Sequence, residues 1–578
     1  MSIKPEFFDY LKHFGATQTL DVYRNSSGPA IALRHDVDYS LDTALEMAYW
    51  EAESGIRATY FLLHTTRYWG TDRFTEKCAQ LLAFGHEIGL HTNLIPAWYC
   101  DGVAPQDTLK TSLECLREAG AEVHGSSAHG DPLCYKNGFI NYWIFSELRP
   151  DDPGARESVL NAEGLRESDP KRRVGYPAQH TLQSQQGKYP LWAVSMRDYG
   201  IEYEASHLES DACFSDSGGS WKRTADPLTC DLSDSRCQVL MHPIHWRGDP
   251  KVYFFLSTAR SGSKWLAQML DSATPCRGVH EYTLNHRNNE KVGGSPVADK
   301  RTGIGLVGFI KDQQEITSRL THTSDVIAHA TCDYAEANVY LPLFLPSLTA
   351  QFPDATLVHL HRNPEDVVLS VMKRGWYDTP DDDRHPRFET IPNWSDLAPL
   401  EKCCHYVAET HGVIQQETNL RLSFESMVSD VGYFQDRLRQ LGIAYYPVLG
   451  RETFWQRINE NDIAVNTASE AWNDRERRMY RDICGITARK LDYSLIARSP
   501  PGKAWRMLRD RIDVGWQRII RWFSKPSVEL LAAEDSGVMV KSGVQKHESG
   551  GGLVELCHLD PIFEFDPDHQ LRKVIETA

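Results

Sequence analysis

Apolar and polar positions follow a repeated strand–helix order along the first half of the chain. Apolar runs at 30–33, 58–63 and 87–90 predict buried strands. Between these runs, apolar residues recur three and four positions apart at 41–52 and 74–82, which predicts amphipathic helices. Strand–helix units of this length favour a parallel sheet, either a barrel or a doubly wound fold.

The same order starts again near residue 251. Val252–Leu256 predicts a short buried strand, followed by a polar loop and a helical stretch at Trp265–Leu270. Thr356–Leu360 predicts a later strand that leads into a loop and helix at Arg362–Val371. This layout is typical of an open α/β nucleotide-binding domain.

We therefore expect three parts: a first domain over 1–250, a second over 251–499, and a tail over 500–578. The tail begins with a basic stretch at 503–525 whose Trp, Leu and Ile residues fall mostly on one helical face. Such a helix is typical of peripheral contact with an anionic membrane surface. A helix packed across the second domain is the alternative, which we favour.

Composition and charge narrow the class of protein. The chain has 578 residues, with 62 Lys+Arg against 79 Asp+Glu and a net charge of −17, which argues against general nucleic-acid binding. A hydrophobic content of 41% is enough for several cores. We see no apolar run long enough for a transmembrane helix, no secretory signal and no CxxC pair among 13 cysteines. These features predict a cytoplasmic protein with reduced thiols.

Acidic and imidazole side chains stand at the ends of the predicted strands in the first domain. Asp36 and Asp38 lie two residues apart and so on the same side of a strand. His91 and His242 each follow an apolar run. Because the carboxyl ends of parallel strands share one edge, these side chains suit a divalent metal of the zinc or cobalt type, with a carboxylate as general base and an imidazole as general acid. The alternative for the acidic pair is capping of the following helix.

The segments ALRHDVD, ATYFLL, GHEIGLHT and LMHPIHW resemble the polysaccharide deacetylase superfamily, over about residues 25–247. The resemblance implies a (β/α) barrel-like domain in which Asp36 is the catalytic base and Asp38 and His91 bind a metal such as Zn²⁺. It also implies that His242 is the general acid.

The chain departs from this family at the second metal histidine, four residues after His91, where Ile95 stands. Either Asn93 or His129 supplies the missing metal ligand, or the domain binds metal weakly or not at all. In the last case residues 1–250 are a catalytically inactive glycan-binding module. The stretch from His129 to Pro132 stands where the family has an arginine–proline element.

The loop STARSGSKW lies between a predicted strand and a predicted helix, where backbone N–H groups and a helix N-terminus bind anions. Gly262 permits close approach of phosphate oxygens beside the hydroxyls of Ser261 and Ser263, and Arg260 and Lys264 supply positive charge. The pattern of an ATPase P-loop is absent, which disfavours an ATP or GTP hydrolase.

A second anion-binding pattern follows about a hundred residues later in HLHRNPEDVVLS. Arg362 ends a predicted strand and Ser370 lies two helical turns further on, so that together they bind one further phosphate. Two phosphate sites on one sheet suggest a nucleotide that is phosphorylated at both ends of its ribose.

Both segments closely resemble sulfotransferases that use 3′-phosphoadenosine 5′-phosphosulfate (PAPS), and the likeness extends over about residues 251–497. It implies a P-loop-like α/β domain with a parallel sheet. Arg260 then stabilises the bridging oxygen, and Glu281 is the base that deprotonates the acceptor, with His280 and His322 as alternatives. The remaining donor ligands implied by the resemblance are Ser261, Gly262, Ser263 and Lys264 on the 5′ side and Arg362 and Ser370 on the 3′ side.

The leading hypothesis is a bifunctional glycan-modifying enzyme. Its domain order resembles heparan-sulfate N-deacetylase/N-sulfotransferases, in which loss of an acetyl group exposes the amine that is sulfated. The predicted acceptor is a cytosolic or lipid-linked precursor of a surface polysaccharide. A scaffold that binds the phosphonucleotide without turnover is a further alternative.

Overall fold

The computed structural model describes residues 3–137, 139–149, 181–285, 313–379, 382, 385–455 and 472–493. The predicted basic helix at 503–525 and the rest of the tail lie outside the described residues. So does most of the polar stretch at 150–190, of which a hairpin of β5 (Thr181–Ser184) and β6 (Gly187–Pro190) is described. No described helix combines the length and the apolar character needed to cross a membrane.

Seven strands form the first sheet, in the order β7–β4–β3–β2–β1–β9–β8, with every neighbouring pair parallel. Within the described residues the outer strands β7 and β8 do not pair with each other, so the sheet is open. The predicted α/β class with parallel strands is confirmed. The strands are β1 (Ala30–Val37), β2 (Thr59–Leu63), β3 (Glu87–Thr92), β4 (Gly125–Ala128), β7 (Tyr203–Glu204), β8 (Ala212–Ser215) and β9 (Arg236–Met241).

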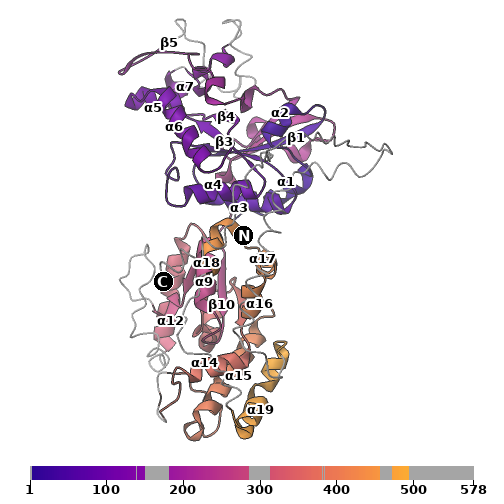
Figure 1. The fold of residues 1–578 in the computed structure, drawn as a ribbon, viewed down its shortest axis with the longest axis vertical. Helices are drawn as coiled ribbons and strands as arrows, with labels where there is room; N and C mark the ends of the chain where they lie inside the picture. The colour runs from indigo at the N-terminus through magenta and orange to yellow at the C-terminus, as the bar shows by residue number, and fades with distance from the viewer. Residues whose placement is uncertain are drawn as a thin grey trace, which may run out of the picture. The chain divides into compact units, whose positions relative to one another are not determined.

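Side chains of β1 alternate between two surroundings. Leu33 and Val37 belong to the large core cluster that includes residues of α3, whereas Ala32 packs in a smaller cluster on the other face. Because strand side chains alternate, Asp36 lies on the Ala32 face and not in the helix-packed core. The helices of this half are α1 (Phe7–Phe14), α2 (Leu20–Asn25), α3 (Leu41–Glu53), α4 (Phe74–Ala83), α5 (Leu94–Asp101), α6 (Pro105–Glu118) and α7 (Pro132–Asn137) (Figure 1).

Five parallel strands form the second sheet, in the order β11–β12–β10–β13–β14. The central strand β10 has Tyr253 and Phe255 in one hydrophobic cluster and Phe254 and Leu256 in another. Both faces of the sheet are therefore buried, which explains the unbroken apolar run in the sequence. The strands are β10 (Val252–Leu256), β11 (Cys276–His280), β12 (Asp333–Asn338), β13 (Thr356–His361) and β14 (Arg421–Ser423).

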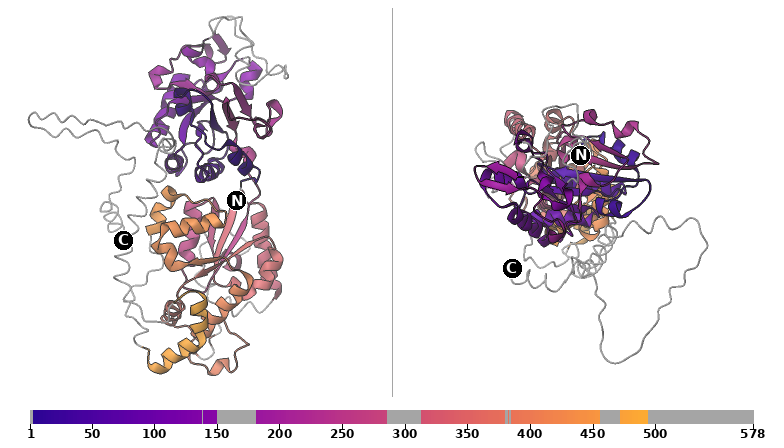
Figure 2. Two further views of the ribbon diagram at one scale, coloured as in Figure 1. Left: turned by 90° about the vertical axis from the view of Figure 1, so that its right-hand side faces the viewer. Right: turned by 90° about the horizontal axis from the view of Figure 1, so that it is seen from above.

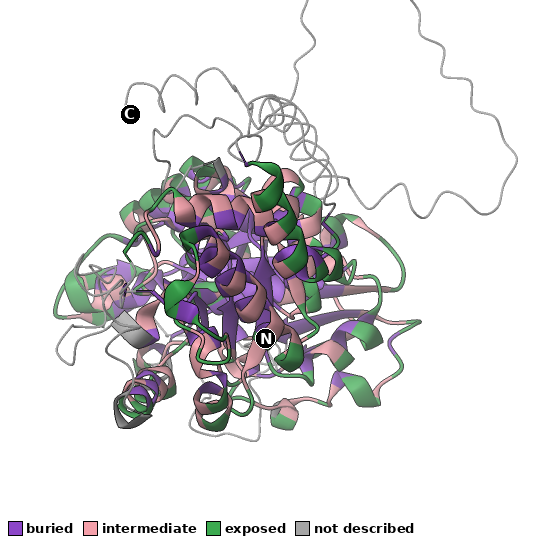
Figure 3. Cartoon of the chain, turned by 90° about the horizontal axis from the view of Figure 1, so that it is seen from below, coloured by how far each residue is buried: buried purple, intermediate pink, exposed green. Residues whose placement is uncertain are grey.

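Helices cover both faces of this second sheet (Figure 2). Their inward residues are buried and their outward residues exposed, as Figure 3 shows for one side. They are α9 (Ser263–Ala273), α10 (Tyr282–Asn285), α12 (Gln313–Ala328), α13 (Leu345–Gln351), α14 (Pro364–Met372), α15 (Pro399–Glu417), α16 (Phe424–Ser429), α17 (Val431–Gln440), α18 (Pro447–Trp455) and α19 (Asp474–Lys490). Single 3₁₀ turns are η1 (Asn141–Ile144), η2 (Ser146–Leu148), η4 (Arg197–Tyr199), η5 (Ala205–His207), η6 (Trp221–Arg223), η7 (Pro227–Thr229), η8 (Pro243–Trp246), η9 (Leu341–Phe344) and η10 (Trp394–Asp396).

Candidate functional site

The first sheet gathers acidic and imidazole groups at the carboxyl ends of its strands. Asp36 is the penultimate residue of β1 and Asp38 follows that strand directly, while His91 lies near the end of β3. His129 follows β4 and His242 follows β9. Because these strands are parallel neighbours, their carboxyl ends meet at one edge, as the sequence predicted.

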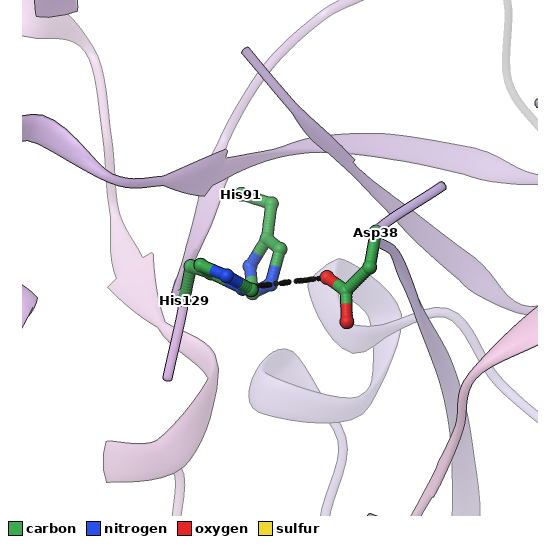
Figure 4. Close-up of side chains that lie close together, drawn as sticks. All are labelled: Asp38, His91 and His129. Carbon is green, nitrogen blue, oxygen red and sulfur yellow. Dashed lines mark hydrogen bonds and ion pairs between the residues drawn. The ribbon is translucent and has the colours of Figure 1, made fainter. Parts of the chain in front are cut away.

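Three of these side chains converge on one point (Figure 4). Asp38 Oδ1 lies 3.3 Å from His91 Nε2 and 3.3 Å from His129 Nδ1. The two ring nitrogens lie 3.2 Å apart. The three ligand atoms lie within 4.8 Å of one another, which is the spacing of groups that hold a single metal ion.

The hydrogen bonds around this cluster leave its ligand atoms facing inward. His91 Nδ1 lies 2.8 Å from the carbonyl oxygen of Ser127 and donates to it, which turns Nε2 toward Asp38. Asp38 Oδ1 is buried and has no hydrogen bond of good geometry within the part of the chain that the structure describes. An orphaned carboxylate oxygen beside two imidazole nitrogens fits the donor set of Zn²⁺.

Asn93, the other candidate for the missing ligand, is engaged elsewhere. Its Nδ2 donates to Asp131 Oδ2 at 2.9 Å, and its Oδ1 accepts from Asn141 Nδ2 at 2.9 Å. Ile95 lies on α5 and is fully buried in the core. The geometry therefore brings His129, and not Asn93, into the cluster.

Asp36 lies beside the cluster at the same edge of the sheet. Its Oδ2 is 3.8 Å from His91 Nε2, and Ser127 Oγ lies 3.3 Å from both of its carboxylate oxygens. Although burial favours the neutral acid, His91 and Arg34 hold the pKa of Asp36 below its ordinary value. The carboxylate is thus ionised and able to accept a proton.

His242 is paired with a carboxylate that the sequence reasoning did not single out. His242 Nδ1 donates to Asp216 Oδ1 at 2.6 Å, and Trp246 Nε1 donates to Asp216 Oδ2 at 2.8 Å. Burial opposes protonation, but the hydrogen bond and charge of Asp216 raise the pKa of His242 to about 9. The second nitrogen, Nε2, faces Asp38 Oδ2 at 4.0 Å. The only sequence signal for Asp216 was an acid directly after a strand.

At the second sheet, the polar loop after β10 is built around two left-handed residues. Arg260 has φ +68° and Gly262 has φ +86°. A non-glycine residue in this region is strained, and such strain concentrates at functional sites. Thr258 and Ser261 are fully buried and their hydroxyl oxygens lie 2.7 Å apart, whereas Lys264 is exposed on the first turn of α9.

The two predicted anion elements meet through hydrogen bonds. Arg260 Nε donates to Ser370 Oγ on α14 at 3.0 Å, and Arg362 Nη1 donates to the carbonyl oxygen of Arg260 at 3.0 Å. Burial and the nearby guanidinium groups of Arg374 and Arg362 lower the pKa of Arg260. Arginines gathered at the carboxyl edge of a parallel sheet make an anion-binding site.

Two of the three candidate acceptor bases lie at the end of β11. His280 ends β11, and its Nε2 lies 3.0 Å from Ser263 Oγ and 3.5 Å from Glu281 Oε1. Burial and Lys264 lower the pKa of His280 to about 4, so this imidazole is neutral at pH 7. Glu281 has φ +54°, a second strained non-glycine residue at this edge. His322 lies on α12, half-buried.

Tyr406 is a further residue of this site that no sequence pattern indicated. It lies on α15, fully buried, and its hydroxyl oxygen accepts a hydrogen bond of 2.7 Å from the Ala259 N–H group. A helix more than a hundred residues away in sequence therefore fixes the backbone of the anion-binding loop.

These features define an α/β domain with a cluster of arginine side chains at the carboxyl edge of its parallel sheet. Residues 253–445 match the model of the sulfotransferase family. The chain thus contains a sulfotransferase domain, as the sequence predicted. The family match does not extend to the first sheet.

Solved structures similar to part of the chain include two sulfotransferases. The sulfotransferase domain from the curacin biosynthetic pathway has 16% identity and a TM-score of 0.28, covering 43% of this chain and 99% of that one. Sulfotransferase STF9 from Mycobacterium avium has 12% identity and a TM-score of 0.28, covering 43% of this chain and 79% of that one. No curated protein matches the chain.

Proposed function

We propose that the second domain transfers a sulfuryl group from PAPS to a hydroxyl or amine of a glycan. The observation that carries this proposal is the meeting of the two anion elements, in which Arg260 bonds to Ser370 and Arg362 bonds to the Arg260 carbonyl. A donor with phosphate on both sides of its ribose needs two such elements on one sheet edge.

In this reaction the acceptor oxygen or nitrogen attacks sulfur while the bond from sulfur to the 5′-phosphate oxygen breaks. The departing phosphate keeps the electron pair, and Arg260 with the backbone N–H groups at the start of α9 stabilises the charge that develops there. The acceptor proton passes to Glu281, the base that we propose, with neutral His280 directly beside it.

The direct test is transfer of isotope-labelled sulfate from PAPS to cell-derived glycans, read by mass spectrometry. Arg260→Ala is expected to lower the rate at least about a hundredfold, because one preorganised charge donor is lost. The matched control is Arg478→Ala, which removes an exposed arginine of α19. Binding of PAPS without transfer to any glycan would favour the non-enzymatic scaffold instead.

A second function is favoured by the cluster in the first domain. We propose that Asp38, His91 and His129 hold a divalent metal such as Zn²⁺ for hydrolysis of an acetamido group on the same class of glycan. The metal would polarise the amide carbonyl and lower the pKa of a bound water. Asp36 is positioned to accept a proton, and His242, oriented by Asp216, to donate one to the leaving amine.

Metal content tests this assignment without any assay of activity. We expect the purified chain to bind about one equivalent of zinc, and Asp38→Asn and His129→Gln each to lose it. His124→Gln, just before β4 and outside the cluster, should keep it. A chain that binds glycan but neither holds zinc nor releases acetate would be the non-catalytic module.

The two proposals together place deacetylation before sulfation, since hydrolysis would expose the amine that the second domain sulfates. A single glycan product that gains sulfate and loses acetyl on the same sugar would support this order. Sulfate found only on hydroxyl oxygens would contradict it.

A further inference from the structure

A network of hydrogen bonds holds the residues directly before and directly after Arg362. After it, the Asn363 N–H group donates to Glu425 Oε1 at 2.8 Å. Before it, His361 Nδ1 lies 3.1 Å from the Tyr493 hydroxyl, which itself donates to Glu425 Oε2 at 2.6 Å. One carboxylate and one phenol therefore connect the residues that flank Arg362.

Three of the four residues in this connection are buried, and Glu425 is half-buried. His361, Asn363 and Tyr493 are 6%, 4% and 8% exposed, so their hydrogen bonds are made in a low-dielectric setting. Burial lowers the pKa of His361 to about 4, which leaves the imidazole neutral with a single N–H group. Since the Tyr493 hydroxyl hydrogen goes to the carboxylate, the His361 proton sits on Nδ1 and points at the phenol oxygen.

The C-terminal end of α19 positions Tyr493 beside His361 and Glu425. The Tyr493 N–H group donates to the Ala488 carbonyl at 2.9 Å, and the Asp492 N–H group donates to the Arg489 carbonyl at 3.1 Å. With Asp492 at φ +63°, this is a Schellman ending, which turns the chain back against the helix. Tyr493 then packs with Ala488 and Leu491 in a small buried cluster.

We infer that Glu425 and Tyr493 are positioning residues that make the donor site selective for a 3′-phosphate. The inference rests on the proposed function, in which Arg362 binds that phosphate. Both act by fixing the peptide on either side of Arg362, whose guanidinium donates to the Arg260 carbonyl at 3.0 Å. A loop fixed in this way presents the guanidinium at one distance and angle, which a bidentate phosphate contact requires.

The test compares two nucleotides on the full chain by calorimetry: 3′-phosphoadenosine 5′-phosphate and adenosine 5′-phosphate. Tyr493→Phe and Glu425→Ala are expected to weaken binding of the bisphosphate about tenfold and to leave the monophosphate unchanged. In turnover, KM for PAPS should rise about tenfold while kcat stays within about twofold. Glu425→Gln, which keeps an oxygen for the Asn363 N–H group, should recover most of the loss.

The control is Tyr445→Phe, which removes another buried hydroxyl of the same domain, one with no hydrogen-bond partner in the described ranges. It should leave the ratio of the two affinities unchanged. Equal losses for both nucleotides, or no loss, in Tyr493→Phe would overturn the inference, because a general structural role does not discriminate between them. If Glu425→Ala does not fold, Tyr493→Phe decides alone, since it deletes a single oxygen.

Different results would refute the PAPS site and the roles of Glu425 and Tyr493. A wild-type chain that binds the bisphosphate no more tightly than the monophosphate would refute the PAPS site itself. A wild-type chain that discriminates, with variants that discriminate equally well, would refute only the roles of Glu425 and Tyr493.

Discussion

Gly262 shows how much of the proposed donor site depends on a single backbone position. Its φ of +86° lies in the left-handed region, and a Cβ built there would lie 2.2 Å from the Phe424 ring. The same ring lies 5.5 Å from the Arg362 guanidinium carbon. Phe424 therefore packs beneath both anion elements, and only glycine leaves room for it.

We expect Gly262→Ala to weaken binding of 3′-phosphoadenosine 5′-phosphate at least about tenfold and to destabilise the fold by about 1–3 kcal/mol, from strain and displaced packing. Calorimetry and thermal unfolding measure the two effects. The control is Gly412→Ala on α15, where a Cβ would meet no atom within 4 Å. That variant should bind normally and be slightly more stable, because alanine favours a helix over glycine. Normal nucleotide binding by Gly262→Ala would contradict the role given to this loop.

At the scale of elements, His86 lies just before β3 and connects this segment to α3 and to the start of β2. Its Nδ1 accepts from the Ala58 N–H group at 3.2 Å, just before β2, and its Nε2 donates to the Ala48 carbonyl on α3 at 2.9 Å. Both bonds require the neutral ring. Burial, partly offset by the charge of Glu51, lowers the pKa of His86 to about 4.

The pKa of His86 is lower in the folded chain than in the unfolded chain. The contribution of His86 to the free energy of unfolding is therefore complete above about pH 6.5 and is lost as the pH falls toward 4. We expect the first domain to lose up to about 3 kcal/mol over this interval through His86 alone. His86→Gln should be less stable at pH 7 but should show a shallower loss on acidification. Denaturant unfolding of both chains from pH 7 to pH 4 provides the measurement; identical slopes would show that His86 does not titrate on unfolding.

At the scale of the whole molecule, the two proposed reactions use separate residues on separate sheets. A chelator or Asp38→Asn is therefore expected to abolish acetate release and to leave sulfate transfer to an amine-bearing acceptor within about twofold. Arg260→Ala should abolish sulfate transfer and leave acetate release within about twofold. Loss of both reactions in either single variant would show that the sites are coupled, and measuring acetate and sulfate in the same reaction mixtures distinguishes these outcomes.

The sequence predicted much of the second domain because its signals are local. The strand Val252–Leu256 was predicted with its observed bounds, and the helix after it begins only two residues earlier than expected. β1 extends four residues beyond the apolar run, since its polar positions His35 and Asp36 are buried by contacts from other elements. Hydrophobic periodicity does not extend the strand over these residues, because their side chains are polar and are buried only by contacts from distant parts of the chain.

What the sequence determined by itself were patterns that neighbouring residues create: the strand–loop–helix that begins at Val252, the paired acids at the end of β1 and the order of the two parallel sheets. The tertiary structure decided which distant residues complete them. His129 approaches His91 because β4 pairs with β3, and Asp216 reaches His242 because β8 pairs with β9. Tyr493 meets Glu425 through the ending of α19. Such meetings depend on strand order and helix packing, which no short stretch of sequence contains.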